Sequence, residues 1–260
     1  MPFLSPEFTY AFLLLLIRTS TMLVSAPLLS HRGIPAMTKV GLAVFLALVL
    51  VPINHGNLPD PPQHLGHVAD AVLREAFLGV VLGLGMNLVF LSLQMAGRII
   101  GVQMGFGLGG VIDPITGVDS GIFDQFYLLL VTLVFFATNG HYVVITALAE
   151  TVRAIPLGSF DPFAASVMRP EVLAGFAIGL MVTAIRVALP IMAALFLVDL
   201  GLGFVAKTAP QIQVLIVALP LKIGVGMLVL LAALPATTHI MQVVLGDPLT
   251  GSSQQLLGVR

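Results

Sequence analysis

A glycine-rich stretch in the middle of the chain carries the residues whose spacing first suggests chemistry. Gly105, Gly107 and Gly110 match the pattern G-x-G-x-x-G, which in dinucleotide-binding folds lets the backbone approach a pyrophosphate. That chemistry needs a preceding strand, a following helix and an acidic residue about 20 positions on, in a soluble βαβ unit. Here the flanking sequence has the character of apolar helices, so the pattern favours another role for these glycines.

Glycine also recurs at a spacing of four residues in two neighbouring places. The positions are Gly79 and Gly83, followed by Gly97, Gly101, Gly105 and Gly109. In membrane helices this spacing allows two backbones to approach closely. We therefore expect close helix packing at the first four of these glycines.

Single charged residues interrupt the apolar runs. They are Arg18, Glu75, Arg186, Asp199 and Lys222. Because a charge at the bilayer centre costs about 2.5–3.5 kcal/mol on insertion scales, each is expected to meet a buried partner on another element or subunit. Their opposite signs make Asp199 and Lys222 the simplest pair. A proton relay is the alternative, and the scarcity of carboxylates disfavours it.

A polar stripe is expected on one of the long apolar segments. At about 100° per residue, Asn87, Gln94 and Arg98 fall within about 40° of one another on a helix. Polar groups in membrane helices face protein or a water-filled path. The stripe is consistent with hydrogen bonds between helices and equally with the lining of a pore.

The other polar clusters predict little chemistry. The loop Asn54–His67 and its neighbour Asp70 hold histidines and aspartates that could ligate a metal, but a solvated loop is the favoured interpretation, and we expect no metal or cofactor. The sequence contains no G-x-S-x-G, H-E-x-x-H or P-loop pattern. Asp113-Pro114 is typical of a turn. We therefore predict that the protein is not an enzyme.

The composition defines the elements that must position these residues. Of 260 residues, 58% are hydrophobic and 9% are charged, whereas soluble domains carry roughly 25% charged residues. The mean hydropathy is +1.08. The sequence therefore predicts an all-α polytopic membrane protein in contact with lipid. A net charge of −1 gives no basic field for nucleic acid.

Six long apolar runs organise the chain as a single membrane domain over residues 1–260. They are Phe8–Leu29, Ile34–Ile53, Val68–Ile100, Ile122–Ile155, Val172–Phe204 and Ile212–Leu245. The first two fit one crossing each, at about 20 residues per span. The other four exceed a bilayer core of about 30 Å, so tilts or kinks must absorb the excess.

Kinks are expected where prolines or a polar break interrupt an apolar run. The sites are Pro190, Pro220, Pro235 and Asn139-Gly140-His141. Broken helices at membrane depth require protein or water around the freed backbone groups, which favours a chain buried among other subunits. The opening residues MPFLSPE have no Lys or Arg, and the run after them contains Arg18. We therefore expect the first run to stay as a helix rather than to act as a cleaved signal peptide.

Four stretches in family order resemble the FliR family. They are RTSTMLVSAPLLSHRGIPAMTKVGLAV, GRIIGVQMGFGLGGVIDP, FFATNGHYVVITAL and LPIMAALFLVDLGLGFVAKTAPQIQVLIVALPLKIGVG. The resemblance covers nearly the whole chain. It implies a multi-pass subunit of the flagellar type III export gate, in the bacterial inner membrane and within the flagellar basal body.

In that family, one FliR joins several copies each of FliP and FliQ in a closed helical assembly, with which FlhB and FlhA associate. The resemblance implies that unfolded flagellar proteins leave the cytoplasm through this assembly. The close alternative is the equivalent subunit of a virulence type III injectisome. A self-contained solute transporter is a further alternative from another class.

The resemblance also assigns a plug that closes the pore, beside a methionine ring supplied by FliP. The plug segment is Gln103 to Asp119, centred on Gly105–Pro114. Its implied gate residues are Gln103, Met104, Gly105, Phe106, Gly107, Leu108, Gly109, Gly110, Val111, Asp113 and Pro114. Some family members carry aromatic residues where this chain has Leu108 and Val111, so Met104, Phe106, Leu108 and Val111 remain alternatives for the seal. A hydrophobic constriction closes by dewetting, and glycine permits bending.

Overall fold

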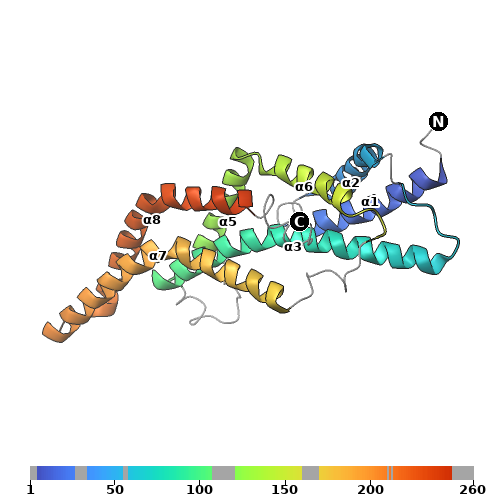
Figure 1. Ribbon diagram of the computed structural model, residues 1–260. Coiled ribbons are helices and arrows are strands. Elements are labelled where there is room, and N and C mark those ends of the chain that lie inside the picture. The colour runs from blue at the N-terminus through green and yellow to red at the C-terminus, as the bar shows by residue number, and fades with distance from the viewer. Residues whose placement is uncertain are drawn as a thin grey trace. The chain divides into compact units, whose positions relative to one another are not determined.

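The computed structural model describes residues 5–26, 34–54, 58–106, 121–159, 170–209, 211 and 213–247. Within these ranges every regular element is a helix (Figure 1). The helices are α1 (Pro6–Ser25), α2 (Ala36–Leu50), the short 3₁₀ helix η2 (Val51–Asn54), α3 (Leu65–Gln103), α5 (Ile122–Ala137), α6 (Gly140–Ala154), α7 (Pro170–Thr208) and α8 (Val214–Asp247). They follow the six apolar runs, and the predicted all-α fold is confirmed.

Four of these helices are long and apolar enough to cross a membrane: α1, α3, α7 and residues Ile216–Val243 of α8. The bent pair α5 and α6 provides a fifth crossing if the two form one span. The second run differs from the expectation of a full crossing, because α2 has 15 residues where about 20 are needed. Pro52 lies two residues after the end of α2, and proline has no N–H with which to continue the helical hydrogen bonds.

The predicted break in the fourth apolar run lies at Asn139. This residue has φ 56° and ψ 33° in the left-handed region, which asparagine tolerates better than most residues. The Thr138 hydroxyl donates to the carbonyls of Val134 and Phe135 in the last turn of α5. As a result, α5 and α6 meet at an angle of 70°.

The three prolines inside apolar runs lie within helices that continue through them. Pro190 lies in α7, and Pro220 and Pro235 lie in α8. Each removes one backbone hydrogen bond and places its ring against the preceding turn, which favours bending. Figure 1 shows α8 as two stretches that meet at a pronounced bend.

The chain divides into two compact units. The first comprises Met1–Val89, Asn139–Phe176 and Leu245–Arg260, and the second comprises Phe90–Thr138 and Ala177–Val244. Helix α3 therefore contributes its first part to one unit and its last turns to the other. Leu14, Leu15 and Leu78 are fully buried in the first unit, and Phe90, Leu93, Ile191 and Leu195 in the second.

Much of the apolar surface of α7 and α8 is not covered by the chain itself. Only 11% of the apolar window of α8 is buried, and side chains such as Phe204 and Leu228 are exposed. A protein in water does not leave such a surface open. Lipid or other protein must therefore cover these two helices.

Candidate functional site

The predicted plug segment begins at the end of α3, where the chain forms a helix cap. The amide of Gly105 donates to the carbonyl of Val102 at 3.1 Å, and the amide of Phe106 donates to the carbonyl of Gly101 at 2.9 Å. Gly105 has φ +98°. This is the hydrogen-bond pattern of a Schellman motif, in which a glycine with positive φ ends the helix.

This cap also explains the first glycine of the G-x-G-x-x-G pattern. A dinucleotide-binding turn follows a β-strand, whereas Gly105 follows the 39-residue helix α3. Its positive φ ends that helix and directs the chain into the plug segment. The dinucleotide interpretation, which the sequence already disfavoured, therefore lacks its structural context.

The first residues of the plug segment pack against α8. The side chain of Met104 is fully buried. A Cβ atom added to Gly226 would lie 2.7 Å from Cε, 2.9 Å from Cγ and 3.0 Å from Sδ of Met104. On the same helix, Leu219 approaches Gly105, where an added Cβ would lie 2.6 Å from its Cδ2 atom. The turn after α3 is thus held by two residues of α8.

The same turn also contacts the start of α5. The ring of Phe106 meets the ring of Phe123 edge-on, with 5.4 Å between centroids. A Cβ on Gly97 would lie 2.5 Å from the carbonyl oxygen of Phe123, and one on Gly101 would lie 3.4 Å from its ring. At Gly97, helix α3 therefore approaches the backbone of α5 closely, as glycine permits.

The predicted gate residues divide into two groups. Gln103 is the last residue of α3 and is half-buried, Met104 is buried, and Phe106 is 41% exposed. The others, Gly107, Leu108, Gly109, Gly110, Val111, Asp113 and Pro114, lie outside the described residues. Which side chain seals a pore therefore stays a prediction.

A second close contact joins α1 to the first part of α3. A Cβ on Gly83 would lie 2.6 Å from the carbonyl oxygen of Met22, and one on Gly79 would collide with the carbonyl group of Arg18. The facing hydroxyl of Ser25 donates to the α1 carbonyl of Thr21 at 2.7 Å. Small residues thus face each other at a spacing of four on both helices.

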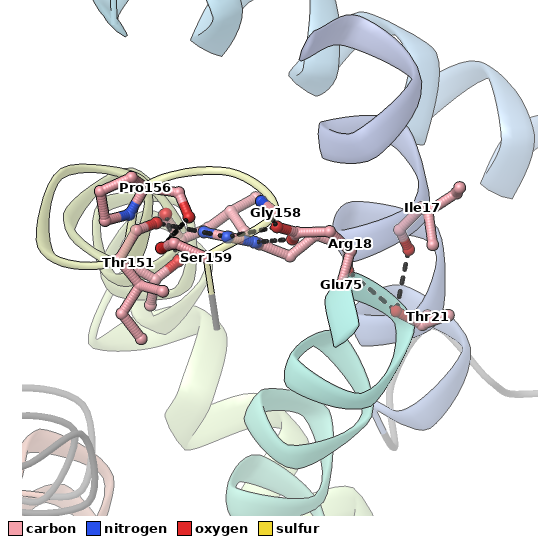
Figure 2. Close-up of polar contacts among 10 residues, drawn as sticks. Ile17, Arg18, Thr21, Glu75, Thr151, Pro156, Gly158 and Ser159 are labelled. Carbon is pink, nitrogen blue, oxygen red and sulfur yellow. Dashed lines mark hydrogen bonds and ion pairs between the residues drawn. The ribbon is translucent and has the colours of Figure 1, made fainter. Parts of the chain in front are cut away.

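An ion pair completes this contact (Figure 2). Arg18 Nε donates to Glu75 Oε2 at 2.5 Å and Nη2 donates to Oε1 at 3.0 Å, with both side chains fully buried. Nη2 also donates to the carbonyl of Ile155 at 3.3 Å, and the amide of Gly158 donates to Glu75 Oε1 at 2.7 Å. The pair therefore joins α1, α3 and the turn after α6.

Sequence reasoning expected a partner for Arg18 without identifying it, and it missed the role of the turn at Gly158. A signal was present, because Glu75 has the opposite charge and is one of two carboxylates in the third apolar run, the other being Asp70 near its start. Gly158 has φ +76°, which glycine adopts without strain. This conformation presents its amide to Glu75.

The structure brings together Asp199 and Lys222, the pair that opposite charge suggested. Lys222 Nζ of α8 lies 2.6 Å from Asp199 Oδ1 of α7, with side chains 21% and 36% exposed. Asn87 and Gln94 are half-buried on α3. Arg98 and Arg186, in contrast, are exposed within this chain, so their expected burial against another subunit stays a prediction. Sequence shows that a charge lies in an apolar run but not which chain covers it.

The described part of the polar loop before α3 includes His64, which lies near His67 in the first turn of that helix. The rings of His64 and His67 are 6.0 Å apart. Among the described residues, no three His, Cys, Asp or Glu side chains are grouped so as to hold a metal ion. His55 lies outside the described residues.

Comparison with known proteins identifies the family. Residues 9–247 match the family described as bacterial export proteins, family 1. The chain is 34% identical to the flagellar biosynthetic protein FliR of Bacillus subtilis, over 86% of each chain. It is 29% identical to the FliR protein of Escherichia coli over 85% of this chain and 82% of that protein.

A relative with a different name matches over a similar length. The chain is 28% identical to the Yop proteins translocation protein T of Yersinia pestis, over 86% of this chain and 85% of that protein. The family match covers nearly all the described helices, from α1 to the end of α8. The chain is a member of the FliR family of bacterial export proteins.

Proposed function

We propose that this chain is a subunit of the flagellar type III export gate and forms, with FliP and FliQ, the channel through which unfolded flagellar proteins cross the inner membrane. The observation that carries this proposal is the 34% identity to a flagellar FliR protein over 86% of both chains. Subunits of such a channel need no catalytic group, so the proposed role is that of a transport component rather than an enzyme.

The uncovered apolar surface of α7 and α8 supports an assembly. A lone solute transporter would be expected to bury the polar groups of its own path. Here Arg98 and Arg186 are exposed, and the apolar window of α8 is largely uncovered. Neighbouring subunits and lipid would cover both kinds of surface. Further partners expected from the family resemblance are FlhB and FlhA.

The position of the plug segment supports the role that we propose for it. It begins at the capped end of α3 and ends before α5, and its first residues are packed against α8. A segment whose two ends are anchored and whose sequence is rich in glycine can bend without losing its attachment. Such a segment is suited to closing a pore and to moving aside. We propose that Gly105–Pro114 restricts the flow of ions and small solutes when no protein is being exported.

Two measurements test the function. Co-expression with FliP and FliQ should yield a stable complex containing all three proteins, and the gene should restore motility to a strain lacking its own FliR. Deletion of Gly105–Pro114 should leave this complex intact but increase ion flux through the membrane. An unchanged ion flux would contradict the plug assignment, and failure to co-purify would contradict the assembly.

An injectisome subunit is the second candidate, favoured by the 28% identity to the Yop proteins translocation protein T. The two functions predict that the gene restores different activities to strains that lack their own subunit. A flagellar subunit restores motility and not the secretion of virulence proteins, whereas an injectisome subunit does the reverse.

A further inference from the structure

Two glycines of helix α8, Gly224 and Gly226, lie two residues apart, and only Gly226 has a side chain from outside the helix packed against it. A Cβ on Gly226 would lie within 3.0 Å of three side-chain atoms of Met104, whereas a Cβ on Gly224 would meet nothing within 4 Å. The local sequence KIGVGML does not distinguish them. Among the described residues, the packing of Met104 therefore requires a small residue at 226 and not at 224.

The contact is part of a face of α8 that holds the end of α3. Leu219 and Gly226 are seven residues apart, about two helical turns, so both point to the same side. They contact Gly105 and Met104 respectively. Lys222 lies on this face between them and pairs with Asp199 of α7. The position of α8 is thus fixed relative to α7 where it meets the plug segment.

Phe106 is held in place by a ring contact, so we infer that movement of the plug segment begins after this residue. Its ring contacts Phe123, which lies just after the other end of that segment. The cap at Gly105 holds the backbone, and Gly226 and Leu219 hold the side-chain packing. Residues 104–106 therefore form a fixed starting point.

We propose that Gly226 is a positioning residue for the gate. By leaving room for the Met104 side chain, it fixes the turn Met104–Phe106 against α8 and so sets where the plug segment starts. This inference rests on the proposed pore-closing role of that segment. A larger residue at 226 collides with Met104 from Cγ outward. Because this side chain is fully buried and has no open space to enter, we expect part of its displacement to pass to the turn.

The test compares Gly226→Val with Gly224→Val in the co-expressed complex. The two changes alter helix propensity equally, and only the first creates a clash. An overpacking penalty of about 1–3 kcal/mol disfavours the positioned turn by about 5- to 150-fold. We expect Gly226→Val to raise ion flux toward that of the Gly105–Pro114 deletion at unchanged complex yield, and Gly224→Val to behave like the wild type. Equal ion flux in the two variants would overturn the inference.

A second-site change shows whether the effect passes through Met104. Combining Gly226→Val with Met104→Ala removes the clashing atoms and should restore most of the low ion flux. A merely structural defect in α8 would not respond to this change. Failure of the rescue would mean that Gly226 does not act through Met104. If Gly226→Val prevents assembly, Gly226→Ala and Gly224→Ala provide the same comparison with one added methyl group.

The contact itself can be tested because the chain contains no cysteine. Met104→Cys with Gly226→Cys should form a disulfide on oxidation of the assembled complex. An added Cβ at 226 lies 2.9 Å from Met104 Cγ, which is the position that the sulfur takes in Met104→Cys. Because Cγ is one bond beyond Cβ, this distance is compatible with the separation of about 3.5–4.5 Å that the two Cβ atoms of a disulfide need. Met104→Cys with Gly224→Cys should not form a disulfide. Absence of the first bridge would overturn the contact.

The outcomes separate this inference from the proposed function. If the Gly105–Pro114 deletion leaks and Gly226→Val does not, only the positioning role of Gly226 fails. If the deletion leaves ion flux unchanged, the plug assignment fails and the inference fails with it. If the deletion and Gly226→Val both raise ion flux, and Met104→Ala restores low flux only in the valine variant, the plug assignment and the positioning role of Gly226 both stand.

Discussion

We expect the loss of either partner of the buried ion pair between Arg18 and Glu75 to lower the unfolding free energy of the chain strongly. Both side chains are fully buried and joined by two hydrogen bonds. Removing one partner from such a pair costs about 3–5 kcal/mol, because the other charge stays buried without compensation. That loss corresponds to a decrease of about 150- to 5000-fold in the ratio of folded to unfolded chain.

The suitable variants are Arg18→Met and Glu75→Gln. Methionine has a similar length to arginine without the charge, and glutamine keeps an oxygen for the Gly158 amide. Each single change should cost the full penalty of an unpaired buried charge or acceptor. The double variant should lose much less than the sum of the two, since it leaves no buried charge.

An exposed ion pair on the same helix provides the control. Arg74 Nε lies 2.7 Å from Asp70 Oδ2, with side chains 30% and 57% exposed. Asp70→Asn should cost about 0.3–0.5 kcal/mol, as exposed pairs one turn apart do. Pulse proteolysis of the tagged chain over a denaturant series, in the co-expressed complex, reports its unfolding free energy. A cost for Glu75→Gln equal to that of Asp70→Asn, or additive effects in the double variant, would refute the reasoning.

Two further predictions concern the backbone. Gly83→Ala should lower the unfolding free energy by about 1–3 kcal/mol, because its Cβ would lie 2.6 Å from the Met22 carbonyl oxygen. A Cβ at Gly85 would meet nothing within 4 Å, so Gly85→Ala should raise the unfolding free energy by up to about 1 kcal/mol. Thermal unfolding of the complex compares the two variants, and equal melting temperatures would contradict the close approach. Asn139→Val should cost about 1–2 kcal/mol at this left-handed position and increase protease cleavage between α5 and α6. Asn139→Gly should not, and cleavage of both variants at one rate would show that the left-handed turn is not required.

Several features of the fold could be predicted from sequence because they depend on local composition. Apolar runs longer than a bilayer is thick predict long helices, and α3, α7 and α8 follow them closely. The polar break at Asn139 predicts the end of α5, because asparagine adopts the left-handed conformation more readily than most residues. The short α2 departs from the predicted full crossing because the second apolar run includes Pro52, which the helix does not continue through.

Pairings between distant residues required the tertiary structure. Arg18 and Glu75 are 57 positions apart, and sequence shows only that each needs a partner. Gly224 and Gly226 have the same local context, and the position of Met104 alone makes one of them necessary. The sequence by itself determined where helices form and where their packing can be close, because these depend on periodicity and residue size. Which groups meet was decided by the tertiary structure, because a contact depends on the relative placement of two helices, which neither helix specifies alone.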